Sequence, residues 1–186
     1  MNMRSKLPVL GVCARASGMG KTTLLTSLLP VLNQAGIRVS LIKQTHAQFD
    51  VDRPGKDSYR LREAGAAQVL LSSPQRWVLM TEQACGSDDD RLMAMLPQMD
   101  PAMADLVLVE GFRNAPIPKI EVYRPGISDL PPQAEVDSSI IACVCDTPTA
   151  AAVRRFRPDQ LPELAAFIGD WLLMQRQQED CATTAS

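Results

Sequence analysis

No stretch of this 186-residue sequence is apolar over the length that a membrane-spanning helix requires. Excess charge of one sign is also lacking: the formal net charge is −2, so no overall positive field attracts nucleic acid or an anionic membrane. Internal repeats, low-complexity tracts and domain linkers are absent from the sequence. We therefore expect a single domain over residues 1–175 and a polar, disordered tail over residues 176–186, with no nucleic-acid or membrane partner.

A disulfide framework is missing as well. The five cysteines are an odd number, and Cys13, Cys143 and Cys145 lie inside apolar runs, where cysteine behaves as a small buried hydrophobic residue. This pattern suits a reducing compartment and predicts a cytoplasmic protein. Cys143 and Cys145 would share one face of a strand, but no second Cys or His pair completes a zinc ligand set, so we expect no metal there.

What the chain does contain is short apolar runs that alternate with amphipathic segments. The apolar runs predict strands at residues 7–13, 37–43, 105–110 and 139–145, and the alternating segment at residues 118–124 predicts a further strand. The amphipathic segments predict helices at residues 21–36, 58–65, 88–99 and 161–175. This alternation is typical of an α/β fold with a mostly parallel sheet flanked by helices. Two further runs, residues 67–73 and 76–82, predict an appended antiparallel strand pair.

Single residues indicate where two of these helices begin and end. Pro30 should remove one hydrogen bond inside the first helix and bend it, and Gly36 should end it. Asp57 or Ser58 should cap the short helix that ends at Gly65.

A glycine-rich segment, RASGMGKTT at residues 15–23, follows the first predicted strand. The usual phosphate-binding pattern has a glycine at the position of Arg15, but a non-glycine fits there if its φ is negative. The amides from Gly18 to Thr22 would face phosphate oxygens at a helix N-terminus, and Lys21 would reach the β- and γ-phosphates. The nucleotide-binding residues that we predict here are Ser17, Gly18, Met19, Gly20, Lys21, Thr22 and Thr23. A ligand-free glycine turn is the alternative, but the order of strand, loop and helix favours a P-loop NTPase fold.

Two carboxylates follow predicted strands at the same end of the sheet. Glu110 closes the run DLVLVE, and we predict that it holds Mg²⁺ together with the hydroxyl of Thr22. Asp146 follows the strand at residues 139–145 and could accept hydrogen bonds from guanine. A carboxylate that closes a strand by chance, and a turn aspartate before Thr147, are the respective alternatives.

The loop after the second strand is rich in functional groups, and its charged residues include Lys43. We predict that Asp50 acts in catalysis beside Lys21, while Asp52 is an alternative for holding Mg²⁺ through water or positioning the attacking water. The turn Gly55, Lys56 and Asp57 resembles a second anion-binding turn at a helix start, so we include it among the nucleotide-binding residues.

Five segments together resemble the MobB family, the adapter proteins of molybdopterin-guanine dinucleotide biosynthesis. They are SGMGKTTLL, LIKQTH, DVDRPGKDSYRLREAGA, QRWVLMTE and DLVLVEGF. The third is the most specific, because ordinary P-loop kinases lack it. The resemblance is strongest from Val9 to Gly111 and continues weakly to the final helix. This chain has Gln44 where relatives often have His, which argues against a metal-binding role for that turn and its His46.

The resemblance implies a GTP-binding protein that uses Mg²⁺, hydrolyses GTP slowly and forms a homodimer. It also implies assistance to a MobA-type guanylyltransferase, and leaves open a contact with molybdopterin itself. A P-loop small-molecule kinase or ATP-dependent ligase is the alternative, and a scaffold with a vestigial site is a third. The strands at residues 67–73 and 76–82 are candidate dimer edges, because a short appended strand pair leaves an edge to cover.

Overall fold

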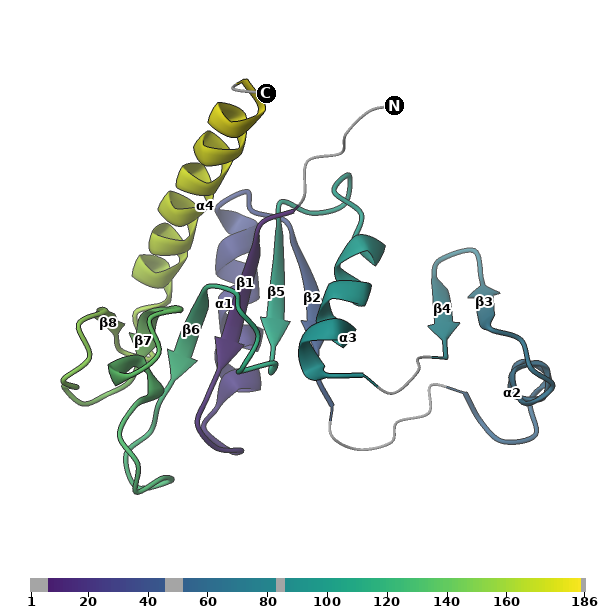
Figure 1. Cartoon of the computed structure of the whole chain (residues 1–186), viewed down its shortest axis with the longest axis horizontal. Helices are drawn as coiled ribbons and strands as arrows, with labels where there is room; N and C mark the ends of the chain where they lie inside the picture. Colours follow the sequence, from purple (N-terminus) through teal and green to yellow (C-terminus); the bar gives the residue numbers. More distant parts are fainter. Residues whose placement is uncertain (1–6, 46–51, 83–85, 185–186) are drawn as a thin grey trace. The chain divides into compact units, whose positions relative to one another are not determined.

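The computed structural model describes residues 7–45, 52–82 and 86–184, and no helix in those ranges is both long and apolar enough to span a membrane. The chain divides into two compact units, residues 1–44 with 88–186 and residues 45–87. The larger unit holds the loop that follows the first strand, together with the sheet. The smaller unit is an insertion between the second strand and the third helix of the chain (Figure 1).

The larger unit is built on a six-stranded sheet in the order β2-β5-β1-β6-β7-β8, in which every pair is parallel. The strands are β1 (Val9–Cys13), β2 (Val39–Lys43), β5 (Leu106–Glu110), β6 (Lys119–Val122), β7 (Ile140–Val144) and β8 (Arg154–Phe156). Its helices are α1 (Lys21–Gln34), α3 (Asp88–Met95), α4 (Leu161–Thr184) and the short 3-10 turns η1 (Leu96–Gln98) and η2 (Gln133–Glu135). The predicted α/β fold with a parallel sheet is therefore confirmed.

Helices cover both faces of this sheet (Figure 1). On one face, α1 and α4 pack against alternate residues of the strands, among them Leu10 and Leu108, which have no exposed surface. On the other face, Leu92 of α3 packs with Val107 and Val109 of β5. Because β5 is buried on both faces, it reads as an unbroken apolar run rather than as an alternating one.

Helix α1 ends as the glycine signal predicts. Gly36 has a φ of 78°, its amide donates to the carbonyl of Asn33, and the next amide, of Ile37, donates to Leu32. These two bonds form a Schellman motif. Pro30 lies inside the helix, which nevertheless runs unbroken to Gln34.

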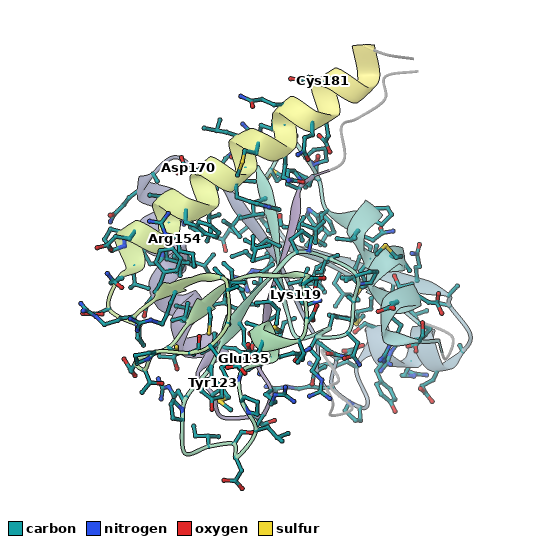
Figure 2. All side chains as sticks on the ribbon, turned by 60° about the vertical axis from the view of Figure 1, so that its left-hand side comes forward. Lys119, Tyr123, Glu135, Arg154, Asp170 and Cys181 are labelled. Atoms are coloured by element: carbon teal, nitrogen blue, oxygen red, sulfur yellow. The ribbon has the colours of Figure 1, made fainter. Side chains whose placement is uncertain are left out.

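The C-terminal helix and the last strand differ from our expectation. We expected the helix to end near residue 175 and a disordered tail to follow, but α4 continues to Thr184, with Cys181 exposed on its last turns (Figure 2). Residues 176–184 contain no Gly or Pro and include Arg, Gln, Glu and Ala, which favour helix. Strand β8 was not predicted, because two of its three residues are exposed arginines.

Strand β6 carries two charged residues into the interior. Lys119 is 2% exposed (Figure 2); its ammonium donates to the carbonyl of Ala115 at 2.8 Å and pairs with Asp137 at 3.5 Å. The carboxylate of Glu121, fully buried, accepts the backbone amides at the start of η2. We expected an alternating strand here; instead all four residues are buried, because β6 lies between β1 and β7.

The smaller unit contains α2 (Asp57–Glu63) and the antiparallel pair β3 (Gln68–Ser72) and β4 (Trp77–Thr81), so the predicted strand pair is confirmed. The predicted cap of α2 is wrong. The N-cap residue is Lys56, whose side chain makes no capping bond, and the hydroxyl of Ser58 donates instead to the carboxylate of Asp52 at 2.9 Å.

Candidate nucleotide-binding site

The loop between β1 and α1 has the backbone that a phosphate-binding turn needs. Gly18 and Gly20 have φ values of 78° and 97°, which favour glycine strongly over residues with a Cβ. Phe112 is the only non-glycine with positive φ among the described residues, so Arg15 keeps a negative φ, as we expected at that position. Gly20 is the N-cap of α1 and no side chain caps the helix, so the first amides of α1 remain available to a ligand.

Met19 anchors the loop to the protein interior. Its side chain is fully buried, and its sulfur accepts a hydrogen bond from the backbone amide of Arg124 at 3.3 Å. Any contact of Met19 with a nucleotide would therefore come from its backbone. The bond also ties the segment after β6 to the phosphate loop.

Three polar groups meet where α1 begins, beside the carboxyl ends of β2 and β5. The Thr22 hydroxyl donates to a carboxylate oxygen of Glu110 at 2.7 Å. The Lys43 ammonium lies 3.0 Å from the other oxygen of that carboxylate and 3.1 Å from the Thr22 oxygen. Lys43 and Glu110 are register partners, so their side chains leave adjacent strands side by side. We call these three residues the Thr22–Glu110–Lys43 cluster.

The cluster fits a hard divalent cation. A hydroxyl oxygen and a carboxylate are the donor types that Mg²⁺ takes, and the sequence predicts both as metal ligands. In the structure the positively charged Lys43 ammonium contacts the oxygens of both Thr22 and Glu110. The Lys43 ammonium thus stands where a metal ion bound by Thr22 and Glu110 would lie. The sequence alone did not predict this, because the pairing of Lys43 with Glu110 depends on strand order.

The turn after β5 holds Glu110 in place. Gly111 has a φ of 97°, and a Cβ there would lie 2.6 Å from the Cβ of Gln44. The Gln44 amide donates to the carbonyl of Glu110, and the Gln44 side-chain oxygen accepts the amide of Phe112 at 2.7 Å. The glutamine that departs from the family pattern therefore braces the turn that presents the carboxylate.

The charge of Arg15 also acts on a buried carboxyl of the sheet. Its charge favours the ionised form of the buried Glu121, and so opposes the effect of burial, which raises the pKa of that carboxyl. The Arg15 carbonyl accepts a bond from the Arg113 guanidinium at 3.2 Å. Arg15 is therefore a lesser influence on the Glu121 carboxyl than the amides of Gln133 and Ala134, which donate hydrogen bonds to it.

The cysteines of the sheet are buried. Cys13 and Cys143 are the register partners of Glu121 on either side, so the three side chains form a row across the sheet. Burial raises the pKa of Cys13 to about 12 and raises the pKa of Cys143 as well. Both thiols therefore stay protonated and unreactive near neutral pH.

The remaining predicted site residues lie elsewhere in the chain or outside its described part. Asp146 is exposed just after β7. Asp52 and the turn of Gly55, Lys56 and Asp57 belong to the smaller unit, whose place relative to the loop is not determined. Asp50 and His46 lie outside the described residues. The roles of all these residues stay predictions.

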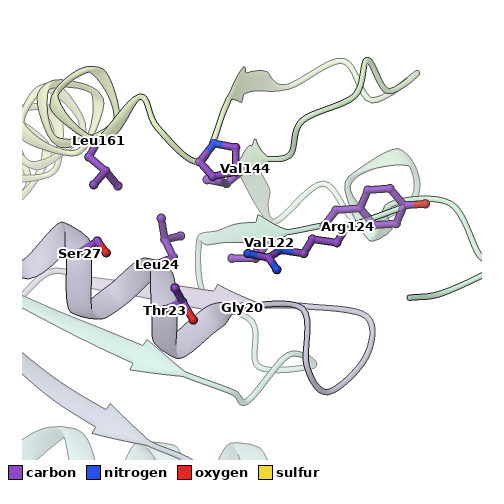
Figure 3. Close-up of a pocket in the computed structure, with 10 residues that line it drawn as sticks. Gly20, Thr23, Leu24, Ser27, Val122, Arg124, Val144 and Leu161 are labelled. Atoms are coloured by element: carbon purple, nitrogen blue, oxygen red, sulfur yellow. The ribbon is translucent and has the colours of Figure 1, made fainter. Parts of the chain in front are cut away.

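A pocket lies beside Gly20 of the loop (Figure 3). It is formed by the start of α1, the ends of β6 and β7, and the segment that leads into α4. Its lining includes Gly20, Thr23, Ser27, Arg124, Pro158 and Leu161.

A glycine-rich loop between the first strand and helix of a parallel sheet, with a carboxylate at the end of the neighbouring strand, defines a P-loop NTPase fold. Within that class the chain belongs to the MobB family, since the family model described as "Molybdopterin guanine dinucleotide synthesis protein B" matches residues 9–146. The predicted resemblance is therefore confirmed.

Individual relatives agree over most of the chain. The "Molybdopterin-guanine dinucleotide biosynthesis adapter protein" of Escherichia coli (strain K12) is 44% identical over 174 residues, which are 94% of this chain and 97% of that protein. The protein of the same name from Haemophilus influenzae is 41% identical over 170 residues, 91% of this chain and 92% of the relative. The crystal structure of "molybdopterin-guanine biosynthesis protein B (mobB)" superposes with a TM-score of 0.67 at 27% identity, covering 88% of this chain and 98% of that one.

Proposed function

We propose that this protein is a GTP-binding, weakly GTP-hydrolysing adapter in molybdopterin guanine dinucleotide biosynthesis, where it assists a MobA-type guanylyltransferase in the cytoplasm. The observation that carries the nucleotide-binding part is the Thr22–Glu110–Lys43 cluster beside the uncapped start of α1. Family membership and the names of the relatives support the adapter role.

Each part of the loop has a distinct task in nucleotide binding. The amides from Gly18 to Thr22 would donate to the oxygens of the β- and γ-phosphates, and Lys21 would add a charge-assisted bond. Thr22 and Glu110 would hold Mg²⁺, which when bound neutralises charge on the phosphates. Lys43 would leave the Glu110 carboxylate as the metal takes its place. Its half-exposed side chain can turn towards the terminal phosphate.

Weak hydrolysis follows from how Glu110 is used. Glu110 is 6% exposed, and its carboxylate would be occupied by Mg²⁺ and the Thr22 hydroxyl, so it is poorly placed to orient an attacking water. We assign that task to Asp50. A partner that positions Asp50, or that supplies a cation, would accelerate the reaction as in related phosphoryl-transfer enzymes.

The smaller unit offers a surface for self-association. Leu70 of β3 and Trp77 of β4 are exposed by 58% and 65%, on a two-stranded sheet. Short sheets with apolar exposed strands pair readily with another chain, so we propose a homodimer through this unit. Light scattering at micromolar concentration should give twice the chain mass of 20.3 kDa, and a monomeric mass would overturn this part.

The function is tested by titrating labelled GTP and ATP with Mg²⁺ into the protein and into Lys21→Ala. We expect GTP to bind more tightly than ATP, and the variant to lose about tenfold or more in affinity, because a charge-assisted hydrogen bond contributes roughly 1.5–3 kcal/mol. Arg176→Ala is the matched control for charge, since Arg176 contacts Asp105 just before β5, at the opposite end of that strand from Glu110.

Each alternative result has a definite meaning. Tighter binding of ATP would favour a kinase or ligase. Absence of binding to either nucleotide would refute the nucleotide site. If GTP binds, the next measurement is the rate of GMP transfer by the guanylyltransferase with and without this protein. An unchanged rate would refute the adapter role.

A further inference from the structure

Arg124 lies directly against the phosphate loop although it is 104 positions away from Gly20 in the sequence. A Cβ built on Gly20 would lie 3.1 Å from a terminal guanidinium nitrogen of Arg124 and 3.3 Å from its central carbon. The side chain comes from the segment just after β6 and extends towards the first turn of α1 (Figure 3). The backbone is held there too, because the Arg124 amide donates to the sulfur of Met19.

The position of Arg124 on the sheet indicates which part of a nucleotide it would meet. In the strand order, β5 and β6 lie on opposite sides of β1. The cluster that would hold Mg²⁺ belongs to the β5 side, so the terminal phosphates lie there. Arg124 belongs to the β6 side and lines the pocket with Thr23 and Ser27, the residues of α1 that follow the loop. The nucleoside end of a bound nucleotide would therefore leave the loop beside Arg124.

The charge of Arg124 is available for this contact. Its side chain is exposed, and within the described residues its guanidinium has no hydrogen bond or ion pair, unlike Arg38, Arg157 and Arg176, each of which pairs with an aspartate. A planar guanidinium beside a glycine loop is well suited to bind a phosphate through two parallel hydrogen bonds.

We propose that the guanidinium of Arg124, just after β6, binds the α-phosphate of the nucleotide, while Lys21 binds the β- and γ-phosphates. This inference rests on the proposed function, since it needs a nucleotide in the loop. It adds a nucleotide-binding residue that lies 101 positions beyond the last residue of the glycine-rich segment.

The test compares three ligands, GTP, GDP and pyrophosphate, in the wild type and in Arg124→Ala, Arg124→Lys and Lys21→Ala. Pyrophosphate fills only two phosphate positions, whereas GTP fills all three. We expect Arg124→Ala to weaken GTP and GDP by about tenfold each and to leave competition by pyrophosphate unchanged. Lys21→Ala should weaken GTP and pyrophosphate alike. Arg124→Lys, which keeps the charge without the planar fork, should fall between wild type and Arg124→Ala.

Stability and charge are controlled separately. The amide that bonds Met19 is retained in every Arg124 variant, so thermal unfolding should match the wild type. Arg176→Ala should bind all three ligands normally. Unchanged GTP affinity in Arg124→Ala, with a loss in Lys21→Ala, would overturn this inference and leave the proposed function standing. An equal loss for pyrophosphate and GTP in Arg124→Ala would overturn it as well. Failure of the wild type to bind GTP would refute the proposed function itself.

Discussion

Replacing Lys43 with Met should make the stability of the protein depend on Mg²⁺. Methionine keeps the length of the side chain and removes its charge, which leaves the Glu110 carboxylate, only 6% exposed, with the Thr22 hydroxyl as its remaining partner in the cluster. Breaking a buried pair costs about 3–5 kcal/mol and an exposed pair about 0–1. Lys43 is half exposed, at 50%, so we expect a loss of about 1–2 kcal/mol without Mg²⁺.

Mg²⁺ should then restore much of this loss. At 10 mM Mg²⁺, a site with a Kd of about 1 mM stabilises the folded state by about 1.4 kcal/mol. In the wild type the ion must first displace Lys43, which raises the Kd by roughly 5–30-fold and limits the gain to about 0.2–0.6 kcal/mol. For a chain of this size the difference of about 1 kcal/mol corresponds to roughly 2–4 °C in the midpoint of thermal unfolding.

The measurement is thermal unfolding of wild type, Lys43→Met and Arg176→Met, each with MgCl₂ and with NaCl at equal ionic strength and without nucleotide. The Arg176 variant removes one positive charge away from the cluster, so its response to Mg²⁺ should equal that of the wild type. The double variant Lys43→Met with Glu110→Gln should lose the response. Equal Mg²⁺ responses in Lys43→Met and wild type would show that the ammonium does not occupy the cation position.

Three further substitutions test hydrogen bonds and packing in the larger unit. Asp105, whose pKa the hydrogen bonds from Arg38 lower from 3.8 to about 2, should contribute about 1 kcal/mol after allowance for solvent screening. Because its folded pKa lies below its unfolded value, this stability is present above about pH 3.8 and is lost as the pH falls towards 2. In Asp105→Asn, the free energy of unfolding measured with urea should therefore depend less on pH over that range. Gly111→Ala should lower the free energy of unfolding in urea by about 2–4 kcal/mol, because of backbone strain and a clash with Gln44. The control Gly126→Ala has a φ of 86° and open space around it, so it should lose only about 1–2 kcal/mol. Equal losses in the two variants would refute the clash. Glu121→Gln presents an amide to one of two backbone donors and should cost about 1–3 kcal/mol in the same assay; unchanged stability would contradict those bonds.

The sequence allowed the parallel sheet and the phosphate loop to be predicted because both depend on neighbouring residues. The glycines of the loop and the leucine stripe of α1 are local signals, and the continuous apolar run of β5 is typical of a strand that is buried on both faces. The end of α1 could also be predicted, since Gly36 alone supplies the left-handed residue of the motif.

What could not be predicted depends on strand order and register. The pairing of Lys43 with Glu110 exists only because β2 lies beside β5, and nothing near Lys43 in the sequence indicates this. The approach of Arg124 to Gly20 depends in the same way on β6 lying beside β1. The burial of Lys119 could not be predicted from the composition of β6, because a strand with Lys and Glu at alternate positions usually has one solvated face.

Gln44 also determines where this chain can be divided. It is the last residue of the larger unit before the insertion; its backbone amide donates to the carbonyl of Glu110 at the end of β5, and its side-chain oxygen accepts the amide of Phe112 in the turn that follows. A designer who wishes to exchange the insertion between relatives should therefore place the first junction after Gln44 and the second before Asp88. A junction one residue earlier would replace Gln44 with the residue of the relative. That substitution would alter the packing against Gly111 and disturb the Glu110 carboxylate.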